Sequence, residues 1–290
     1  RWVASQDSGT VTGNFDQVAA ANGDGFEYYA RIRRSADSTN VTAISARHQI
    51  EYLDLVPLQG KEVTLSWVAK AGAQFSAASS AMLINVYYGT TADQSSANPG
   101  GWAGFAYTLQ TTQVITTSFV KYSTTFTVNA NAKEMQVQLG FTPVGTAGAD
   151  DSINISNVQL EEGGIATDFE YLPYEQSLAL CQRYLYKIDG DIADRGLGLV
   201  GQAYSTTTAI VAILFPVESR IAFTGVTVSG ATDFALTVAN SGRQASTSLI
   251  FGAAFPQGGW VAPSVAANIV AGNAVTLWSA VDDAFILFTG

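Results

Sequence analysis

The chain has 290 residues, which is enough for one large domain or two ordinary domains, each with its own core. Only 13% of the residues are charged and the net charge is −10, which argues against binding to nucleic-acid backbones because Lys and Arg are not in excess. The single cysteine, Cys181, excludes an intrachain disulfide and a cysteine-based metal site, and no apolar run approaches the roughly 20 residues of a membrane-spanning helix.

The first part of the chain, residues 1–170, reads as a series of short strands. Segments of alternating polarity, or rich in β-branched and aromatic residues, are separated by Gly, Asn, Asp, Ser and Pro. This spacing predicts an antiparallel β-sandwich of the jelly-roll type. The predicted strands are Glu27–Arg33, Thr42–Glu51, Glu62–Ala69, Met82–Tyr88, Gly104–Gln110, Lys121–Val128, Glu134–Phe141 and Ile153–Leu160.

A short helix and a second β-region follow. Leu178, Cys181, Leu185 and Ile188 recur at three- and four-residue steps, which predicts one helix from Tyr174 to Ile188 within a linker of residues 171–188. Residues 189–290 return to short strands and predict a second, smaller β-sandwich, so the whole chain is expected to be all-β. The predicted strands are Gly196–Ala203, Thr208–Phe215, Gly225–Ser229, Phe234–Val238, Ser246–Phe251, Ala274–Ser279 and Ala284–Phe288.

The junction between the two parts has the most distinctive amino-acid sequence in the chain. It runs Ile155-Ser-Asn-Val-Gln-Leu-Glu-Glu-Gly-Gly-Ile-Ala-Thr-Asp-Phe-Glu-Tyr-Leu-Pro-Tyr174 and continues as Glu175-Gln-Ser-Leu-Ala-Leu-Cys-Gln-Arg-Tyr-Leu-Tyr186. It resembles a phrase of tailed-bacteriophage fibre and appendage proteins, "VQLEEG…ATPFE…PY…LCQRYY", which joins a carbohydrate-binding-module-like sandwich to a C-terminal β-domain. The chain departs from this phrase at Asp168, where Pro is usual, and at Leu185, where an aromatic residue is usual.

Weaker phrases extend the resemblance along the chain. Residues 58–71 resemble the "G..vtlSfwaka" strand of carbohydrate-binding modules of the galactose-binding-like type. Residues 116–127 resemble the "ttsW..yt.tft" strand of the same modules, with Phe119 in place of the usual Trp. In the second half, residues 205–208 and 215–220 resemble the "sTT.A" turn and the "FPV.MR" strand end of the appendage proteins.

No catalytic centre is recognisable in the sequence. His48 is the only histidine and no Gly-x-Ser-x-Gly elbow accompanies it, so a packed or hydrogen-bonded strand histidine is the alternative to a catalytic one. The acidic pairs Asp150-Asp151, Glu161-Glu162 and Asp282-Asp283 are sequential, and neighbouring side chains of a strand point to opposite faces. The sequence also lacks the fixed-period repeat of a β-helix depolymerase. We therefore expect no enzyme and no catalytic residue.

Galactose-binding-like sandwiches often hold a structural Ca²⁺ between the first long loop and the penultimate strand, and the resemblance implies such a site here. Asp24 and Glu27 of the loop Asn22-Gly-Asp-Gly-Phe-Glu27 would supply one half. Asn157 would supply the other half, where those modules usually offer an Asp. The alternative is an ordinary Asn-Gly or Asp-Gly turn without a metal, and no other cofactor is expected.

Sugar recognition relies on aromatic rings that stack on pyranose faces, with amide and charged side chains hydrogen-bonded to the hydroxyls. Trp102 follows Asn98-Pro-Gly-Gly101, a segment poorly suited to a sheet interior, so we expect it at a loop tip or sheet edge. Tyr87 and Tyr88 point to opposite faces of one strand, so at most one contributes. Subunit or core packing is the alternative for these rings. The candidate residues are Trp102, Tyr87, Tyr88, Phe105 and Tyr107.

The resemblance implies a phage virion structural protein: a tail fibre, spike or head fibre subunit that attaches to host-surface glycans through several weak sites acting together. It also implies a homotrimer held mainly by the C-terminal module and the helix, and an anchoring region before Arg1 that contacts other virion proteins. Two alternatives stay open. One is a capsid or tail decoration protein that binds no receptor, and the other is a polysaccharide depolymerase or esterase with an accessory sugar module.

Overall fold

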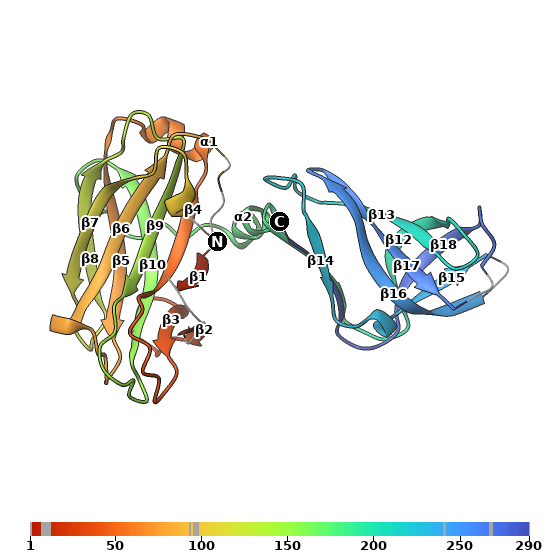
Figure 1. Ribbon diagram of the computed structural model, residues 1–290, viewed down its shortest axis with the longest axis horizontal. Coiled ribbons are helices and arrows are strands. Elements are labelled where there is room, and N and C mark those ends of the chain that lie inside the picture. Colours follow the sequence, from red (N-terminus) through yellow and green to blue (C-terminus); the bar gives the residue numbers. More distant parts are fainter. Residues whose placement is uncertain are drawn as a thin grey trace. The chain divides into compact units, whose positions relative to one another are not determined.

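The computed structural model describes residues 2–6, 13–92, 94, 99–239, 242–266 and 269–289. The chain divides into two compact units, Arg1–Tyr171 and Leu172–Gly290, which are described separately below. Strands β1 to β19 account for most of the described elements, with only short helices between them (Figure 1). The predicted all-β class is therefore confirmed. Within the described residues, no helix has the length and hydropathy needed to span a bilayer.

The first unit is a sandwich of two five-stranded antiparallel sheets, as the strand spacing predicted. Successive strands pass repeatedly from one sheet to the other, which is the connectivity of a jelly roll. Sheet A contains, in spatial order, β1 (Trp2–Gln6), β4 (Ile44–Ile50), β9 (Glu134–Phe141), β6 (Ala81–Gly89) and β7 (Ala106–Val114). Sheet B contains β2 (Gly13–Ala19), β3 (Tyr28–Arg34), β10 (Ser152–Glu162), β5 (Glu62–Ala71) and β8 (Val120–Thr127).

Strand β9 shows how the sequence builds this sandwich. Met135, Val137, Leu139 and Phe141 alternate with polar residues and glycine, and all four are buried in the core between the sheets. Each apolar side chain that leaves water in this way contributes about 1.5–3 kcal/mol to folding. Because the side-chain period of a strand is two, the intervening residues of β9 lie on the outer face of sheet A.

Residues 163–171, called the strap below, follow β10 and run back over the outer face of sheet B. The hydroxyl of Thr64 donates to the carbonyl of Gly163 over 2.6 Å. The hydroxyl of Thr167 donates to the Glu161 carboxylate over 2.6 Å. The backbone N–H of Glu170 donates to the side-chain oxygen of Gln159 over 2.8 Å. The acidic end of β10 thus serves to hold the strap on the sheet.

The second unit begins with α2 (Tyr174–Gln182), which carries the exposed Cys181. The helix predicted to reach Ile188 ends at Gln182, and residues 185 to 188 belong instead to β11 (Leu185–Gly190). Tyr186 and Ile188 pack against the core of this unit while Leu185 stays exposed, so the period here is two. Pairing of β11 with β19 (Ala284–Thr289) overrides the helical spacing.

The rest of this unit is a barrel where a small sandwich was predicted. Closure of the sheet leaves no unpaired edge, which a sandwich of this size would have to protect. A separate sheet combines β11, β19 and β14 (Gly225–Val228). The closed barrel contains, in spatial order, β12 (Arg195–Ala203), β13 (Ala209–Leu214), β17 (Gly258–Val265), β16 (Gly242–Phe255), β15 (Phe234–Val238) and β18 (Ala274–Ser279).

Candidate functional site

Trp102 lies in the loop that leads into β7, the edge strand of sheet A, which agrees with a position at a loop tip or sheet edge. The expectation that its ring is exposed there was wrong, because the side chain is buried. Its side chain is only 5% exposed and meets the ring of Tyr87 edge-on, with centroids 6.1 Å apart. The loop closes over it because the backbone N–H of Thr90 donates to the Ala103 carbonyl and the N–H of Ala103 donates to Gln94 Oε1, over 2.8 and 2.6 Å. Neither face of the indole is open to a sugar in this conformation.

Of the other four predicted aromatic residues, Tyr87, Tyr88 and Tyr107 lie on strands and divide by strand face, and Phe105 directly precedes β7. Tyr88 turns toward the core and its hydroxyl accepts a hydrogen bond from Asn129, while Tyr87 lies on the opposite, outer face of sheet A. Tyr87 is buried there and contacts the rings of Phe105 and Tyr107 at centroid distances of 5.6 and 5.7 Å. Tyr107 is 47% exposed. Of the predicted set, it is the ring that presents itself to solvent.

Beside this aromatic cluster, polar side chains form a row across sheet A that sequence reasoning missed. Strand register aligns Arg47 of β4 with Gln138 of β9, Gln138 with Asn85 of β6, and Asn85 with Gln110 of β7. The amide of Asn85 donates to Gln138 over 2.9 Å, and the amide of Gln138 donates to Ser45 over 2.9 Å. Arg47, Gln138 and Asn85 are buried, whereas Gln110 is exposed. We call these four residues the polar row.

A second row runs next to it, one pair of residues further along the strands. It aligns Gln49, Gln136, Tyr87 and Tyr107. The hydroxyl of Tyr87 donates to Gln136 over 2.8 Å, and the amide of Gln49 donates to Glu134 over 2.5 Å. Hydrogen bonds thus orient Asn85 and Gln138 in the polar row and Tyr87 and Gln136 in the second row. Both rows end on β7, where Tyr107 and Gln110 reach solvent.

The chemistry of the rows suits a neutral, hydroxyl-rich ligand. Each amide offers both a donor and an acceptor, as a sugar hydroxyl does, and an adjacent ring supplies an apolar face. A signal for the rows was present in Glu134-Met-Gln-Val-Gln-Leu-Gly-Phe141, where amides alternate with core residues. What the sequence did not contain was the register that sets Asn85 and Arg47 on either side of Gln138.

Of the residues predicted to bind calcium, Asn157 lies near the loop that contains Asp24 and Glu27, and the side chain of Tyr171 bridges the two. The Asp24 carboxylate accepts from the backbone N–H of Ala21 in its own turn, and Glu27 is exposed. The amide of Asn157 donates to the hydroxyl of Tyr171 over 3.2 Å, and this hydroxyl donates to the carbonyl of Gly25 over 2.8 Å. In the part of the chain that is described, no three His, Cys, Asp or Glu side chains gather as a metal site would require. The calcium site stays a prediction.

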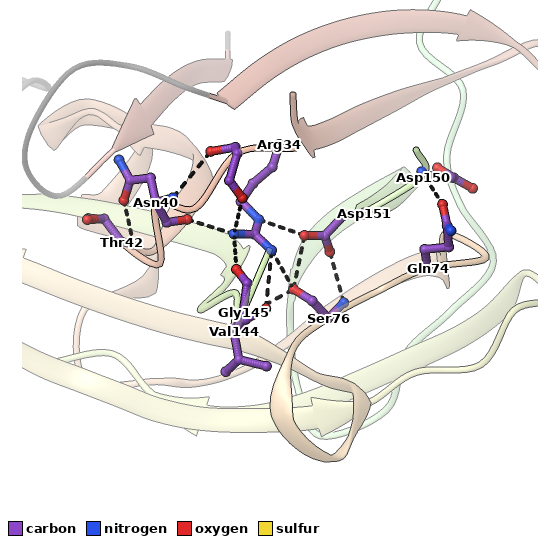
Figure 2. Close-up of polar contacts among 10 residues, drawn as sticks. Arg34, Asn40, Thr42, Gln74, Ser76, Val144, Gly145, Asp150 and Asp151 are labelled. Atoms are coloured by element: carbon purple, nitrogen blue, oxygen red, sulfur yellow. Dashed lines mark hydrogen bonds and ion pairs between the residues drawn. The ribbon is translucent and has the colours of Figure 1, made fainter. Parts of the chain in front are cut away.

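Elsewhere in the first unit, oxygen atoms surround the guanidinium group of Arg34 (Figure 2). The guanidinium of Arg34, at the end of β3, donates to the Asp151 carboxylate over 2.6 Å, and both side chains are fully buried. Its other N–H groups donate to the carbonyl oxygens of Asn40 (2.8 Å), Gly145 (2.9 Å), Ser38 (3.2 Å) and Val144 (3.2 Å) and to the hydroxyl of Ser76 (3.2 Å). We call these acceptors the oxygen cage.

The oxygen cage has a structural role. Carbonyls combined with a carboxylate are the ligands that proteins use for Ca²⁺, and here a covalently attached guanidinium fills the same kind of space. Asp151 is held further by the N–H of Ser76 over 2.8 Å. The cage joins the loops that follow β3, β5 and β9 to the start of β10, and so fixes one end of the sandwich.

Two carboxylates on the outer face of sheet B have altered proton affinities. The Arg33 side chain, which donates to Asp16 over 2.7 Å, lowers the pKa of Asp16, and Arg31 adds to the effect. Hydrogen bonds from Thr167 and then Gln159 lower the pKa of Glu161. Each carboxylate is kept ionised by contacts that hold strands or the strap together.

No protein-family model matches the sequence, and no curated protein matches it. Among solved structures, the chain is similar to a CBM4 carbohydrate-binding module, with 17% identity over 56% of this chain and 86% of that one and a TM-score of 0.37. It is similar to the xylan-binding domain of CBM 22, with 15% identity over 57% of this chain and 89% of that one and a TM-score of 0.36.

A third similar structure is the enzymatically active domain of tailspike protein 4 from bacteriophage CBA120. The identity is 14%, and the match covers 56% of this chain but only 19% of that one, with a TM-score of 0.37. At these identities and TM-scores, the similarities do not identify a function.

Proposed function

We propose that the first unit binds a glycan on the outer face of sheet A, at the β7 side where the two rows reach solvent. The observation that carries this proposal is the pair of rows that strand register extends from the hydrogen-bonded Asn85–Gln138 and Tyr87–Gln136 pairs to the exposed Gln110 and Tyr107. Tyr107 stacks on a pyranose face while Gln110 bonds hydroxyl groups of the same sugar or its neighbour. Asn85 and Gln138 behind them are already ordered by their mutual hydrogen bond, so little side-chain freedom is lost on binding.

We further propose that the chain acts without catalysis, as a homotrimeric subunit on the surface of a phage virion. The support for this part is the junction phrase of residues 155–186, which resembles phage fibre and appendage proteins. Single protein–sugar contacts of this kind are weak, on the order of millimolar. Several copies on one particle raise the avidity by about 10²–10⁴ without any new contact, provided that they engage the same surface.

A matched pair of tyrosines tests the site. Tyr107 and Tyr28 are both 47% exposed strand residues, but Tyr28 lies on β3 of sheet B. After a glycan array identifies a ligand for the full chain, titration calorimetry should show Tyr107→Ala weakening binding by about 5- to 150-fold, the effect of losing 1–3 kcal/mol of stacking. Tyr28→Ala should bind like the parent.

Equal effects of the two substitutions, or none from Tyr107→Ala, would place the site elsewhere. Absence of any array signal would favour a decoration protein without receptor binding. Release of reducing ends or acetate from host polysaccharide by the purified chain would instead establish an enzyme.

A further inference from the structure

The loop between β2 and β3, residues 20–27, contains the only Asn-Gly sequence in the chain, at Asn22 and Gly23. Every other asparagine is followed by a residue that carries a side chain. Asparagine is one of the thermolabile residues of proteins, and a following glycine has no Cβ to keep its backbone nitrogen away from the asparagine carboxamide. The loop therefore contains the two residue types that spontaneous deamidation requires in sequence.

The structure leaves both residues accessible. Asn22 and Gly23 are exposed, and a Cβ added to Gly23 would meet no atom within 4 Å. Gly23 has a φ of +103°, which residues with a side chain rarely adopt. Within the described residues, neither the Asn22 carboxamide nor the Gly23 N–H makes a hydrogen bond. Neither of the two groups that must react is therefore held by another part of the fold.

The turn that carries these residues is held only by exposed contacts at its two ends. The N–H of Asp24 donates to the Ala21 carbonyl over 3.2 Å, and the Asp24 carboxylate accepts from the Ala21 N–H over 3.1 Å. This bond pattern places Gly23 at the third position of a β-turn, where a positive φ favours glycine. Each such bond contributes about 0.5–1.5 kcal/mol, so rotation of the turn towards a reactive conformation has a small free-energy cost.

We propose that Asn22 is a site of spontaneous deamidation. The backbone nitrogen of Gly23 attacks Cγ of Asn22, and the new C–N bond closes a succinimide ring. The bond from Cγ to the side-chain nitrogen breaks, and this nitrogen leaves as ammonia with the proton of the Gly23 N–H. Water then opens the ring at one carbonyl to give aspartate, or at the other to give isoaspartate. No oxidant or reductant is consumed, and the inference is independent of glycan binding and of self-association.

The two products differ in what they do to the first unit. Both add a carboxylate to a loop that already carries Asp24 and Glu27. Isoaspartate also directs the main chain through the former side chain, which lengthens the backbone by one carbon just before Gly25. The carbonyl of Gly25 accepts the hydroxyl of Tyr171, at the end of the strap, over 2.8 Å. We therefore expect the isoaspartate form, and not the aspartate form, to loosen the strap.

The test compares the full chain aged at pH 9 with a sample held at pH 5. Attack requires loss of the Gly23 amide proton, so the reaction accelerates with hydroxide concentration. Intact-mass spectrometry should show a gain of one mass unit at pH 9, and peptide mapping should assign it to position 22 as a mixture of aspartate and isoaspartate. Asn22→Gln should lose this gain, because the longer side chain closes a ring more slowly. The internal control is the exposed Asn131, which precedes Ala132 and should stay unmodified.

An unchanged mass at pH 9, or conversion at other asparagines with position 22 intact, would overturn the proposed site. Hydrogen–deuterium exchange then tests the consequence for the strap. The N–H groups of Thr167 and Glu170 donate to side chains of β10 over 3.1 and 2.8 Å. They should exchange faster in the purified isoaspartate form than in fresh protein, whereas Asn22→Asp, which adds only the charge, should exchange like the parent. Equal exchange in all three overturns the effect on the strap but leaves the deamidation site standing.

Discussion

The Arg34 guanidinium lies 2.6 Å from the Asp151 carboxylate with both side chains fully removed from solvent. This pair connects the end of β3 to the start of β10, residues far apart in the sequence. A buried ion pair is weak evidence of net stabilisation by itself, but loss of one partner leaves the other charge uncompensated in a dry environment. The oxygen cage raises the free-energy cost of losing either partner, because every acceptor in it is arranged around the Arg34 guanidinium.

Asp151→Asn should destabilise the first unit by about 3–5 kcal/mol, the usual effect of breaking a buried pair from one side. Urea unfolding of the full chain measures it. The control is Glu162→Gln, which breaks the exposed Lys61–Glu162 pair at 2.8 Å and should cost less than about 1 kcal/mol. Similar losses for the two substitutions would mean that burial of the Arg34–Asp151 pair has no special consequence.

Arg34→Ala should leave a cavity lined by carbonyl oxygens and the Asp151 carboxylate, and a free cation should partly refill it. We expect guanidinium chloride at low millimolar concentration to raise the Tm of Arg34→Ala, while the same concentration of sodium chloride does not. The parent should show no such rise, because its cage is filled. CaCl₂ in place of guanidinium asks whether the cage accepts a metal. No rise with either cation would show that the cage collapses without Arg34.

Trp102→Ala should lower stability by about 3–5 kcal/mol, because a buried ring leaves a cavity that the loop cannot fully close. Differential scanning calorimetry of the full chain measures the effect. Tyr107→Ala removes an exposed ring of the same cluster and should change the Tm little. A Trp102→Ala protein that melts like the parent would contradict the closed loop and return Trp102 to the list of exposed sugar-binding rings.

The stability difference between the parent and Asp16→Asn should depend on pH. Since Arg33 lowers the pKa of Asp16 in the folded state, the ionised carboxylate stabilises the protein above the ordinary Asp pKa of about 4. This contribution is lost as the pH falls through the lowered folded value. Urea unfolding at pH 7, 5, 4 and 3 should show a constant difference of less than about 1 kcal/mol that shrinks only at the acid end. A difference that is unchanged at pH 3 would rule out ionisation as its cause.

The sequence was most informative where one periodicity dominated. Strand β9 was predicted with its observed bounds because polar and apolar residues alternate without interruption from Glu134 to Phe141. Strand β2 was missed because Gly13, Asn14 and Asp16 read as turn residues, although pairing with β3 makes them a strand.

The candidate site was less predictable because it depends on long-range register and on loop closure. No local sequence pattern indicates that Asn85 and Arg47 flank Gln138 on neighbouring strands. The glycines before Trp102 correctly indicated a loop, but a bond from the Ala103 N–H to the Gln94 side chain folds that loop inward. The sequence therefore indicated which residue types the candidate site contains, but it did not predict which of them are exposed.

Cys181 allows the number of chain copies in an assembly to be counted by fluorescent labelling. It is the one thiol in the chain and lies exposed on α2, so a maleimide dye attaches at one known position without any substitution. Each assembly then carries as many dyes as it has copies of the chain. The number of discrete photobleaching steps from a single labelled particle reports the subunit count of the natural sequence at picomolar concentration, far below the range in which light scattering operates.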